Sequence, residues 1–176
     1  MRVMGAIEGR GVRLRPAVPA DRAAFRAVLA CPEVARWWGD PDEEAEDACA
    51  PSGDGRTYAI EFRGTVAGLI QAWEEPTRDF RHAGIDVAVH AGVHRRGIGG
   101  AALYALARHL FDADGHHRLT IDPAVENEGA VRLYRRLGFR PVGVMRQYER
   151  RADGLTRDGL LMDMLAGELT DPGPAG

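Results

Sequence analysis

The stretch from Gly84 to Phe111 constrains the fold more than any other part of the chain. Residues 84–90 alternate and are rich in β-branched side chains, which predicts a strand. A turn rich in glycine and arginine follows at residues 94–100, and from Ala101 onward leucines recur at helical spacing. A strand, a glycine turn and a helix together present free backbone N–H groups and a positive helix dipole. The pattern therefore predicts a turn that binds a pyrophosphate.

Two other kinds of glycine-rich loop also join a strand to a helix. A dinucleotide-binding Gly-x-Gly-x-x-Gly loop also joins a strand to a helix, but here no acidic residue ends the following strand. The chain contains no lysine, which excludes the Gly-Lys-Ser/Thr loop of nucleotide triphosphatases. The remaining alternative is a plain strand-to-helix turn that uses glycine only for tightness.

Composition and charge restrict the class of protein. The chain has 176 residues, 45% hydrophobic and 28% charged, which fits one domain of a soluble protein. No apolar run approaches the roughly 20 residues that a membrane span needs. Residues 1–10 lack the apolar core of a signal peptide. We therefore expect a cytoplasmic protein with no membrane partner.

Two further exclusions come from charge and cysteine content. The net charge of −3 argues against nucleic acid as the main partner. Cys31 and Cys49 are the only cysteines, and their spacing fits neither a zinc site nor a redox pair. We expect two free thiols and no metal.

Strand and helix patterns alternate along the chain in a mixed order, without an internal repeat or a domain linker. They predict one α/β sheet with helices on both faces, in a single domain at 1–169 with a disordered tail at 170–176. Loops are predicted at 51–55 and 74–81. The predicted strands are 11–15, 57–63, 66–73, 84–90, 119–122, 139–150 and 155–165, and the predicted helices are about 21–30, 32–38, 101–111 and 127–137.

Six acidic residues lie between Gly39 and Ala48, directly after Trp37 and Trp38. One interpretation is a solvated helix face that follows two core aromatics. The other is one wall of a pocket for a cationic ligand such as a polyamine, because aromatic faces and carboxylates both attract cations. Glu74 adds a carboxylate in a later predicted loop.

Three features together resemble the GCN5-related N-acetyltransferases: the glycine turn, a closing hairpin, and the pattern Asn127…Ala130…Leu133-Tyr134…Gly138-Phe139. The resemblance implies a mixed, mostly antiparallel sheet of about seven strands. Its fourth and fifth strands would splay apart, and acetyl-CoA would lie between them. The family has Gln or Arg first in the turn, where this chain has a histidine. The implied pyrophosphate-binding residues are His94, Arg95, Arg96, Gly97, Gly99 and Gly100.

A finer likeness is to the aminoglycoside 6′-N-acetyltransferases. It involves the Trp-Trp-Gly of residues 37–39, Gly84-Ile85-Asp86 and Ile121-Asp122-Pro123. It implies acetyl-CoA-dependent transfer to a primary amine of a cationic small molecule, most plausibly an aminoglycoside 6′-amine, and thus antibiotic resistance. The closing hairpin also resembles ribosomal-protein and small-amine acetyltransferases. The alternatives are a protein N-terminus, a polyamine or a siderophore precursor as acceptor, or a non-catalytic acyl-CoA-binding module. Related folds often pair through their last strands, so a homodimer is an open expectation.

The catalytic candidates are Asp86 and Tyr134. An alkylammonium has a pKa near 10, so a carboxylate that attracts the cation and accepts its proton suits a general base. The resemblance supports Asp86 in that role; the alternative is an ion pair with Arg81. The family places a tyrosine at Tyr134 to protonate the leaving thiolate; the alternative is that it only packs between its helix and the cofactor.

The remaining candidates bind the cofactor arm or the acceptor. The backbone of Val87 and Val89 is expected to pair with the pantetheine arm, and one of their N–H groups to stabilise an oxyanion. Asn127 is expected to hydrogen-bond the same arm, or only to cap its helix. Asp122 would hold a second ammonium, or form an Asx turn before Pro123. The predicted acceptor-binding residues are Trp38, Asp40, Glu74, Asp86 and Asp122.

Overall fold

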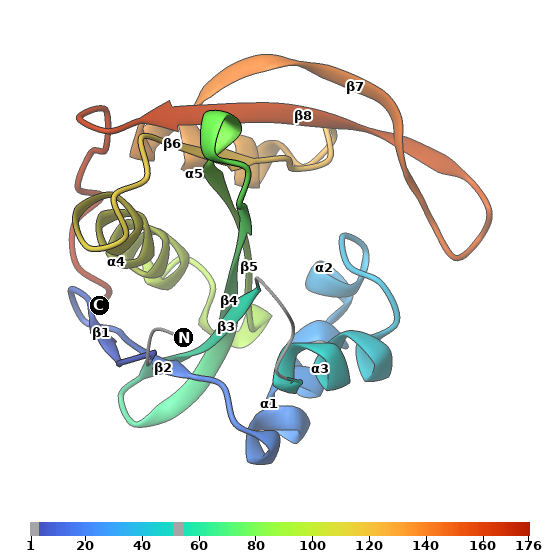
Figure 1. Cartoon of the computed structure of the whole chain (residues 1–176). Helices are drawn as coiled ribbons and strands as arrows, with labels where there is room; N and C mark the ends of the chain where they lie inside the picture. The colour runs from blue at the N-terminus through green and yellow to red at the C-terminus, as the bar shows by residue number, and fades with distance from the viewer. Residues whose placement is uncertain (1–3, 51–54) are drawn as a thin grey trace.

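The computed structural model describes residues 4–50 and 55–176, so the predicted loop at 51–55 lies outside it except for Gly55. One mixed sheet has the strand order β1-β2-β3-β4-β5-β6-β8-β7 (Figure 1). Its strands are β1 (Ile7–Glu8), β2 (Arg13–Pro16), β3 (Arg56–Phe62), β4 (Thr65–Glu75), β5 (His82–Val89), β6 (Arg118–Ile121), β7 (Arg140–Arg150) and β8 (Thr156–Leu165). The predicted mixed α/β sheet is confirmed, with one strand more than expected, the two-residue β1.

Helices cover both faces of the sheet, as predicted. They are α1 (Arg22–Leu29), α2 (Pro32–Ala35), α3 (Pro41–Cys49), α4 (Ile98–Asp112) and α5 (Glu128–Leu137). Helices α1 and α3 bury residues such as Phe25 and Ala45 with Leu69 of β4, on one face. Helices α4 and α5 bury Leu106 and Leu137 in the larger core on the other face.

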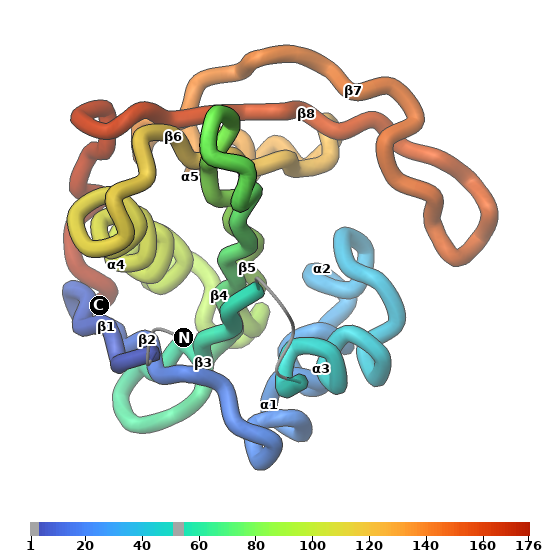
Figure 2. Tube along the Cα trace, in the orientation of Figure 1, coloured from blue at the N-terminus to red at the C-terminus, as the bar shows by residue number. Residues whose placement is uncertain are grey.

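The sheet opens between β5 and β6. This is the one parallel strand pair among the described residues, and it contains only Ala83 beside Leu119 and Gly84 beside Thr120. By contrast, β4 and β5 stay paired from Gly68 to Glu75. Beyond Gly84, β5 and β6 diverge, as the tube in Figure 2 shows. The predicted splay is therefore present, and it leaves one edge of β5 without a strand neighbour.

Strand β4 is longer than predicted and continues to Glu75. Side chains alternate between the two faces of a strand, so Trp73 and Glu74 point in opposite directions. Trp73 lies opposite Gly84 in the register. A Cβ built on Gly84 would come within 2.0 Å of the Trp73 ring, so only glycine allows this aromatic to lie across β5.

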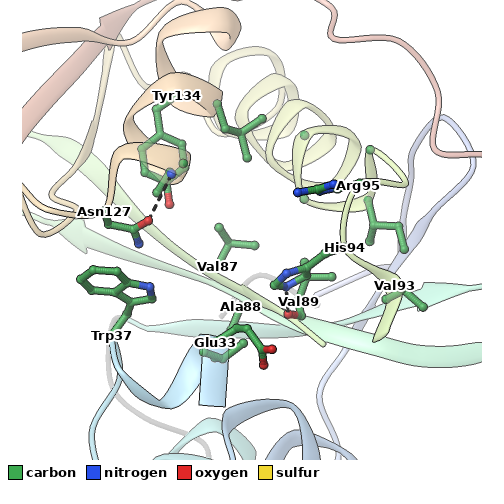
Figure 3. Close-up of a pocket in the computed structure, with 18 of the residues that line it drawn as sticks. Glu33, Trp37, Val87, Ala88, Val89, Val93, His94, Arg95, Asn127 and Tyr134 are labelled. Atoms are coloured by element: carbon green, nitrogen blue, oxygen red, sulfur yellow. Dashed lines mark hydrogen bonds between the residues drawn. The ribbon is translucent and has the colours of Figure 1, made fainter. Parts of the chain in front are cut away.

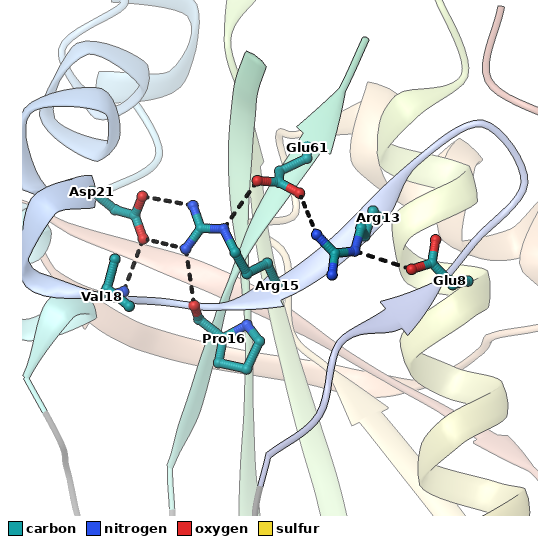
Figure 4. A network of polar contacts seen from close by, with 7 residues as sticks. All are labelled: Glu8, Arg13, Arg15, Pro16, Val18, Asp21 and Glu61. Atoms are coloured by element: carbon teal, nitrogen blue, oxygen red, sulfur yellow. Dashed lines mark hydrogen bonds and ion pairs between the residues drawn. The ribbon is translucent and has the colours of Figure 1, made fainter. Parts of the chain in front are cut away.

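An ion-pair network joins the N-terminal strands to α1 (Figure 4). Asp21 is the N-cap residue of α1, but its side chain makes no cap hydrogen bond to that helix. It accepts two hydrogen bonds from Arg15, at 2.9 and 2.8 Å, and one from the Val18 N–H at 2.8 Å. The Arg15 bonds hold the pKa of Asp21 below its usual range. Arg15 also donates to Glu61 at 3.0 Å, so β2, β3 and α1 are tied together.

Residues 170–176, for which we expected disorder, make defined contacts. The Thr170 N–H donates to the Leu137 carbonyl at 2.8 Å, and the Ala175 N–H to Arg10 at 2.9 Å. The Gly176 N–H donates to the Arg96 carbonyl at 3.0 Å. The segment has no apolar periodicity of its own, so sequence reasoning could not place it. In the structure it runs from the end of α5 to the turn before α4.

We expect Gly138→Ala to destabilise the protein. Gly138 ends α5 at φ +115°, and an added Cβ would lie 2.2 Å from the Glu168 carbonyl oxygen, which is backbone. Backbone strain at residue 138 and displacement of the Glu168 carbonyl should together lower the free energy of unfolding by about 2 kcal/mol or more. Thermal denaturation should show a Tm lower by roughly 4–10 °C. The control is Gly143→Ala, whose Cβ would meet no atom within 4 Å. Equal Tm values for the two variants would contradict this account.

Candidate active site

A cavity of about 500 Å³ lies where β5 leaves β6 (Figure 3). One side is the free edge of β5, and the other sides are the turn before α4, the start of α5 and the end of α2. Its lining includes Val87, Val89, His94, Arg95, Gly97, Gly99, Gly100, Asn127, Tyr134 and Trp37.

The turn before α4 is built to expose backbone amides. Gly97 precedes the helix with φ +72°, and Arg95 has φ +65°, a conformation that favours glycine. The first amides of a helix have no intrahelical partner, so those of the 15-residue α4 are free to bind an anion. The His94 Nε2 donates to the Val89 carbonyl at 2.7 Å. This histidine thus fixes the end of β5 instead of presenting Nε2 to a phosphate.

The cavity brings together all but one of the predicted cofactor-binding residues. Arg96 is the exception, since it is not part of the lining and its carbonyl accepts from Gly176. None of residues 170–176 lines the cavity either. A Cβ on Gly97 would lie 3.4 Å from the Pro174 carbonyl, so the tail supports the turn from outside the cavity.

We expect Arg95→Gln to raise the KM for acetyl-CoA about tenfold, because it removes a cation that lines the cavity. Arg96→Gln is the matched control, with the same change one residue away but outside the lining. It should change that KM less than twofold. Steady-state kinetics with acetyl-CoA varied, repeated at two salt concentrations, make the measurement. Equal effects of the two substitutions would show that the total positive charge of the turn affects the KM and that Arg95 has no specific contact.

A second cavity, of about 480 Å³, adjoins the first. The two share Trp37, Trp38, Val87, Asn127 and Tyr134 as lining residues. Four carboxylates line the second cavity, those of Glu44, Asp86, Asp122 and Glu149. One arginine, Arg157, also lines it, but this side chain is paired with Glu149. The second cavity is therefore an acidic cleft with aromatic walls.

Asp86 lies in this cleft on β5, opposite Gln71 in the register. Burial, with the nearby charges of Asp122 and Glu44, raises the pKa of Asp86 to about 6. The alternative partner, Arg81, instead donates to the Asp114 carbonyl at 3.1 Å. Within residues 4–50 and 55–176 no arginine pairs with Asp86. A carboxylate in this environment suits proton transfer near neutral pH.

Tyr134 lies at the junction of the two cavities. Its side chain is 7% exposed, and its ring meets Phe139 edge-on with 6.1 Å between centroids. Burial, with the charges of Asp86 and Asp122, raises the pKa of Tyr134 above its usual value. The phenol therefore stays protonated at working pH. Its hydroxyl faces the cavity (Figure 3) and has no hydrogen-bond partner in the described part of the chain.

Asn127 and Asp122 also lie at the cleft. The Asn127 side chain caps α5 by accepting from the Ala130 N–H at 3.2 Å, and the same residue lines both cavities. Its amide NH₂ is left for a ligand, so the two interpretations of Asn127 are compatible. Asp122 accepts a hydrogen bond from the Tyr148 hydroxyl, which belongs to β7.

Two predicted acceptor-binding residues lie elsewhere. Asp40 caps α3, accepting from the backbone N–H of Asp42 at 2.9 Å, and does not line the cleft. Of the acidic segment only Glu44 reaches the cleft; Asp42, for example, pairs with Arg26 at 2.7 Å. Asp40 therefore lies outside the cleft, because it caps α3, and the helix turns most of the carboxylates that follow toward solvent.

Glu74 points to the other face of the sheet, because it follows Trp73 on the extended β4. There it pairs with Arg56 at 2.9 Å, and Arg56 also pairs with Asp114 at 2.7 Å. Glu74, Asp114 and His116 lie close enough together to hold a metal ion, but Arg56 already supplies positive charge to two of them. The cluster is an ion-pair network, and Glu74 lies in it and not in the lining of the acidic cleft.

Several lining residues were not among the predicted site residues. They include Trp37, Glu44, Gln71, Trp73, Tyr148, Glu149 and Arg157. The paired tryptophans and the acidic run were visible signals for the first two. Nothing in the sequence indicates that the β7–β8 hairpin bends over the cleft.

The comparison with protein families decides the assignment. The model described as "Acetyltransferase (GNAT) family" matches residues 23–139, which contain β3 to α5 and the glycine turn. The chain belongs to this family. It is accordingly an N-acetyltransferase. The hairpin residues of the acidic cleft lie outside the matched segment.

Solved GNAT structures share the fold across nearly the whole chain. RimJ from Mycobacterium smegmatis, in complex with a CoA-disulfide, is 26% identical with a TM-score of 0.78, covering 94% of this chain and 88% of that one. RimL, a ribosomal L7/L12 α-N-protein acetyltransferase in complex with coenzyme A, is 20% identical with a TM-score of 0.79, covering 91% and 97%.

A third similar structure, AAC(6')-Ib in complex with paromomycin and acetyl-CoA, is 22% identical with a TM-score of 0.71, covering 89% and 94%. A comparison with curated proteins finds no match. No helix in the described part of this N-acetyltransferase has the length and apolarity of a membrane span.

Proposed function

We propose that this N-acetyltransferase moves an acetyl group from acetyl-CoA to a primary amine of a cationic small molecule. The cavity along the free edge of β5 is taken as the donor cavity, and the acidic cleft beside it as the acceptor cavity. The observation that carries the proposal is the acidic cleft, in which four carboxylates and three tryptophans lie beside the donor cavity, with Tyr134 shared by both. Carboxylates and aromatic faces both favour a cation. The residues of the donor cavity fit coenzyme A, since free amides at the start of α4 and Arg95 suit a pyrophosphate.

The named residues then divide the chemistry. Acetyl-CoA supplies the acyl thioester. Asp86 accepts a proton from the acceptor ammonium, and the freed amine bonds to the acyl carbon as the carbon–sulfur bond breaks. Tyr134 donates its proton to the leaving sulfur. The nitrogen of the new amide then loses its second proton, which passes to Tyr134 and restores the phenol. The proton held by Asp86 is released to solvent, so the net reaction releases one proton.

The first acceptor that we propose is an aminoglycoside, acetylated at its 6′-amine. A polycation of this kind places one ammonium at Asp86 and others near Asp122, Glu44 and Glu149, which suits the charge of the cleft. The fold shared with AAC(6')-Ib is consistent with this acceptor. Acetylation of the 6′-amine removes a positive charge from the antibiotic, so resistance is the proposed biological role.

A second candidate acceptor is a protein N-terminus. The identity to RimJ favours it, and so does acid–base matching. An α-ammonium has a pKa of about 7.7–8.0 against about 10.4 for a lysine-like amine. A base whose pKa is about 6 therefore deprotonates an α-ammonium with a smaller free-energy loss.

A CoA-release assay distinguishes these acceptors. The panel contains an aminoglycoside with a 6′-amine, its analogue with a 6′-hydroxyl, a polyamine and short peptides with free N-termini. We expect release with the 6′-amine compound and almost none with its 6′-hydroxyl analogue. Release with peptides alone would move the assignment to a protein N-terminus. Silence on every amine would overturn the proposal.

A further inference from the structure

Arg157 on β8 makes several hydrogen bonds at the acceptor cleft. It is 6% exposed, yet it is a cation in a site that otherwise attracts cations. Its Nε and Nη2 donate to the two carboxylate oxygens of Glu149 at 2.6 and 2.7 Å. Its Nη1 donates to the Arg36 carbonyl at 2.6 Å and its Nη2 also to the Trp37 carbonyl at 3.0 Å. The guanidinium lies 5.4 Å from the centre of the Trp37 ring.

These contacts join two parts of the chain that lie 120 and 121 residues apart in sequence. Arg36 and Trp37 follow α2, in the helical layer over β4 and β5, whereas Glu149 and Arg157 belong to the hairpin at the far edge of the sheet. Figure 1 shows the β7–β8 hairpin reaching across toward α2. The planar guanidinium fork lets one buried arginine donate to a carboxylate and two carbonyls at once. The ammonium of a lysine does not provide this geometry.

The backbone of β7 is bent to deliver its side chains to this cleft. The register with β8 shifts between Met145 and Glu149, and Gln147 has φ +51°. The Gln147 N–H is held by Asp158 at 2.7 Å. A bulge of this kind re-aims the residues beside it. Gly159 of β8 leaves room for Tyr148, since a Cβ added to Gly159 would lie 2.7 Å from the Tyr148 ring.

As a result, two consecutive residues complete the acceptor wall. Tyr148 reaches Asp122 with its hydroxyl, and Glu149 reaches Arg157. Asp122 holds the Tyr148 proton so firmly that the pKa of Tyr148 is raised to about 12. The segment that carries these residues lies beyond the match to the family, which ends at residue 139.

We infer that Arg157 is a positioning residue for the acceptor: it locks Trp37 and Glu149 in place and so decides which amines the cleft accepts. This inference rests on the proposed function, in that the acidic cavity is taken as the acceptor side. Arg157 does not line the donor cavity, and of the residues that it holds Glu149 does not either, whereas Trp37 lines both cavities. Its loss should therefore change the acceptor kinetics more than the donor kinetics.

The test compares Arg157→Lys with Arg146→Lys, the same change at an exposed position of β7 that does not line the cleft. Arg157→Lys should lower kcat/KM for the acceptor about tenfold or more, since misplacement by about 1 Å costs up to 10²-fold. The KM for acetyl-CoA should stay within twofold. Glu149→Gln removes the charge of the other partner in the same ion pair. Because the Glu149 side chain is 41% exposed, this change creates no buried cavity, and it should shift the KM of the acceptor alone.

A readout that needs no acceptor separates this inference from the proposed function. In a Trp38→Phe, Trp73→Phe background, Trp37 is the only tryptophan left. Arg157→Lys should then increase acrylamide quenching of Trp37 at least twofold relative to Arg146→Lys. Unchanged quenching would overturn the inference, as would equal losses of donor and acceptor kinetics. Increased quenching in a protein that acetylates no amine would leave the lock in place and count against the proposed function alone.

Discussion

Replacing Asp86 by asparagine is expected to lower kcat/KM for the acceptor by about 10²- to 10⁴-fold, the range of a lost general base. Asparagine keeps the shape of the side chain but accepts no proton from an ammonium. Binding of acetyl-CoA, measured by calorimetry, should stay within twofold because Asp86 lines the acceptor cavity and not the donor cavity. Full activity of this variant would remove Asp86 from the proposed mechanism.

The same residue sets the expected pH profile. With its pKa near 6, Asp86 is protonated and inactive as a base below that pH. The rate should therefore fall as the pH drops through about 6. Asp122→Asn removes one of the charges that raise this pKa, so the acidic limb should move to lower pH. An acidic limb that does not move would show that another group titrates.

Stability provides the control for the asparagine variant. The pKa of Asp86 is higher in the folded protein than its ordinary value of 3.8, so the folded state binds this proton more tightly than the unfolded state. The contribution of Asp86 to stability is thus present at low pH and is lost as the pH rises through about 6. Asp86→Asn should be at least as stable as the parent at pH 8, and lost activity there cannot then be attributed to unfolding.

Removing the hydroxyl of Tyr134 is expected to have the second largest effect. Tyr134→Phe should lower kcat about 10²-fold with little change in either KM, because it removes a proton donor needed only as the carbon–sulfur bond breaks. Phenylalanine keeps the packing against Phe139, and the hydroxyl has no partner in the described residues to lose. Steady-state and single-turnover kinetics measure the change. An unchanged kcat would reduce Tyr134 to a packing role.

The two catalytic groups are electrostatically coupled. The charge of Asp86 contributes to the raised pKa of Tyr134. When Asp86 accepts the proton of the acceptor, that charge is neutralised and the phenol becomes a better acid. Tyr148→Phe is the matched control, since it removes a hydroxyl that binds Asp122 in the same cleft. It should raise the KM of the acceptor and leave kcat largely intact.

Sequence reasoning succeeded where function depends on local geometry. The strand, turn and helix around Gly97 are contiguous, so the pattern of residues 84–111 was enough to predict them. The sequence pattern did not predict the side-chain direction of residues near the end of a strand or helix, because that direction depends on where the element ends. Glu74 was assigned to a loop, but β4 continues through it and the alternation of the strand turns it to the other face.

The acidic segment illustrates the same limit. Its charge could be counted in the sequence, but a helix has several faces. Only the docking of α3 decides that Glu44 enters the cleft while Asp40 remains at the cap. The tail at 170–176 was likewise unpredictable, since its hydrogen bonds go to Arg10, Arg96 and Leu137, which are distant in sequence.

By itself, the sequence determined the glycine turn that opens α4, with the strand that carries Asp86 before it and the helix that carries Tyr134 after it. Those features are set by backbone conformation over a few residues, and a short pattern encodes them. Only the tertiary structure decided the acceptor side. There Trp37, Glu44, Tyr148 and Arg157 converge from four separate segments, and such a convergence arises from strand register and helix packing, which no single segment specifies.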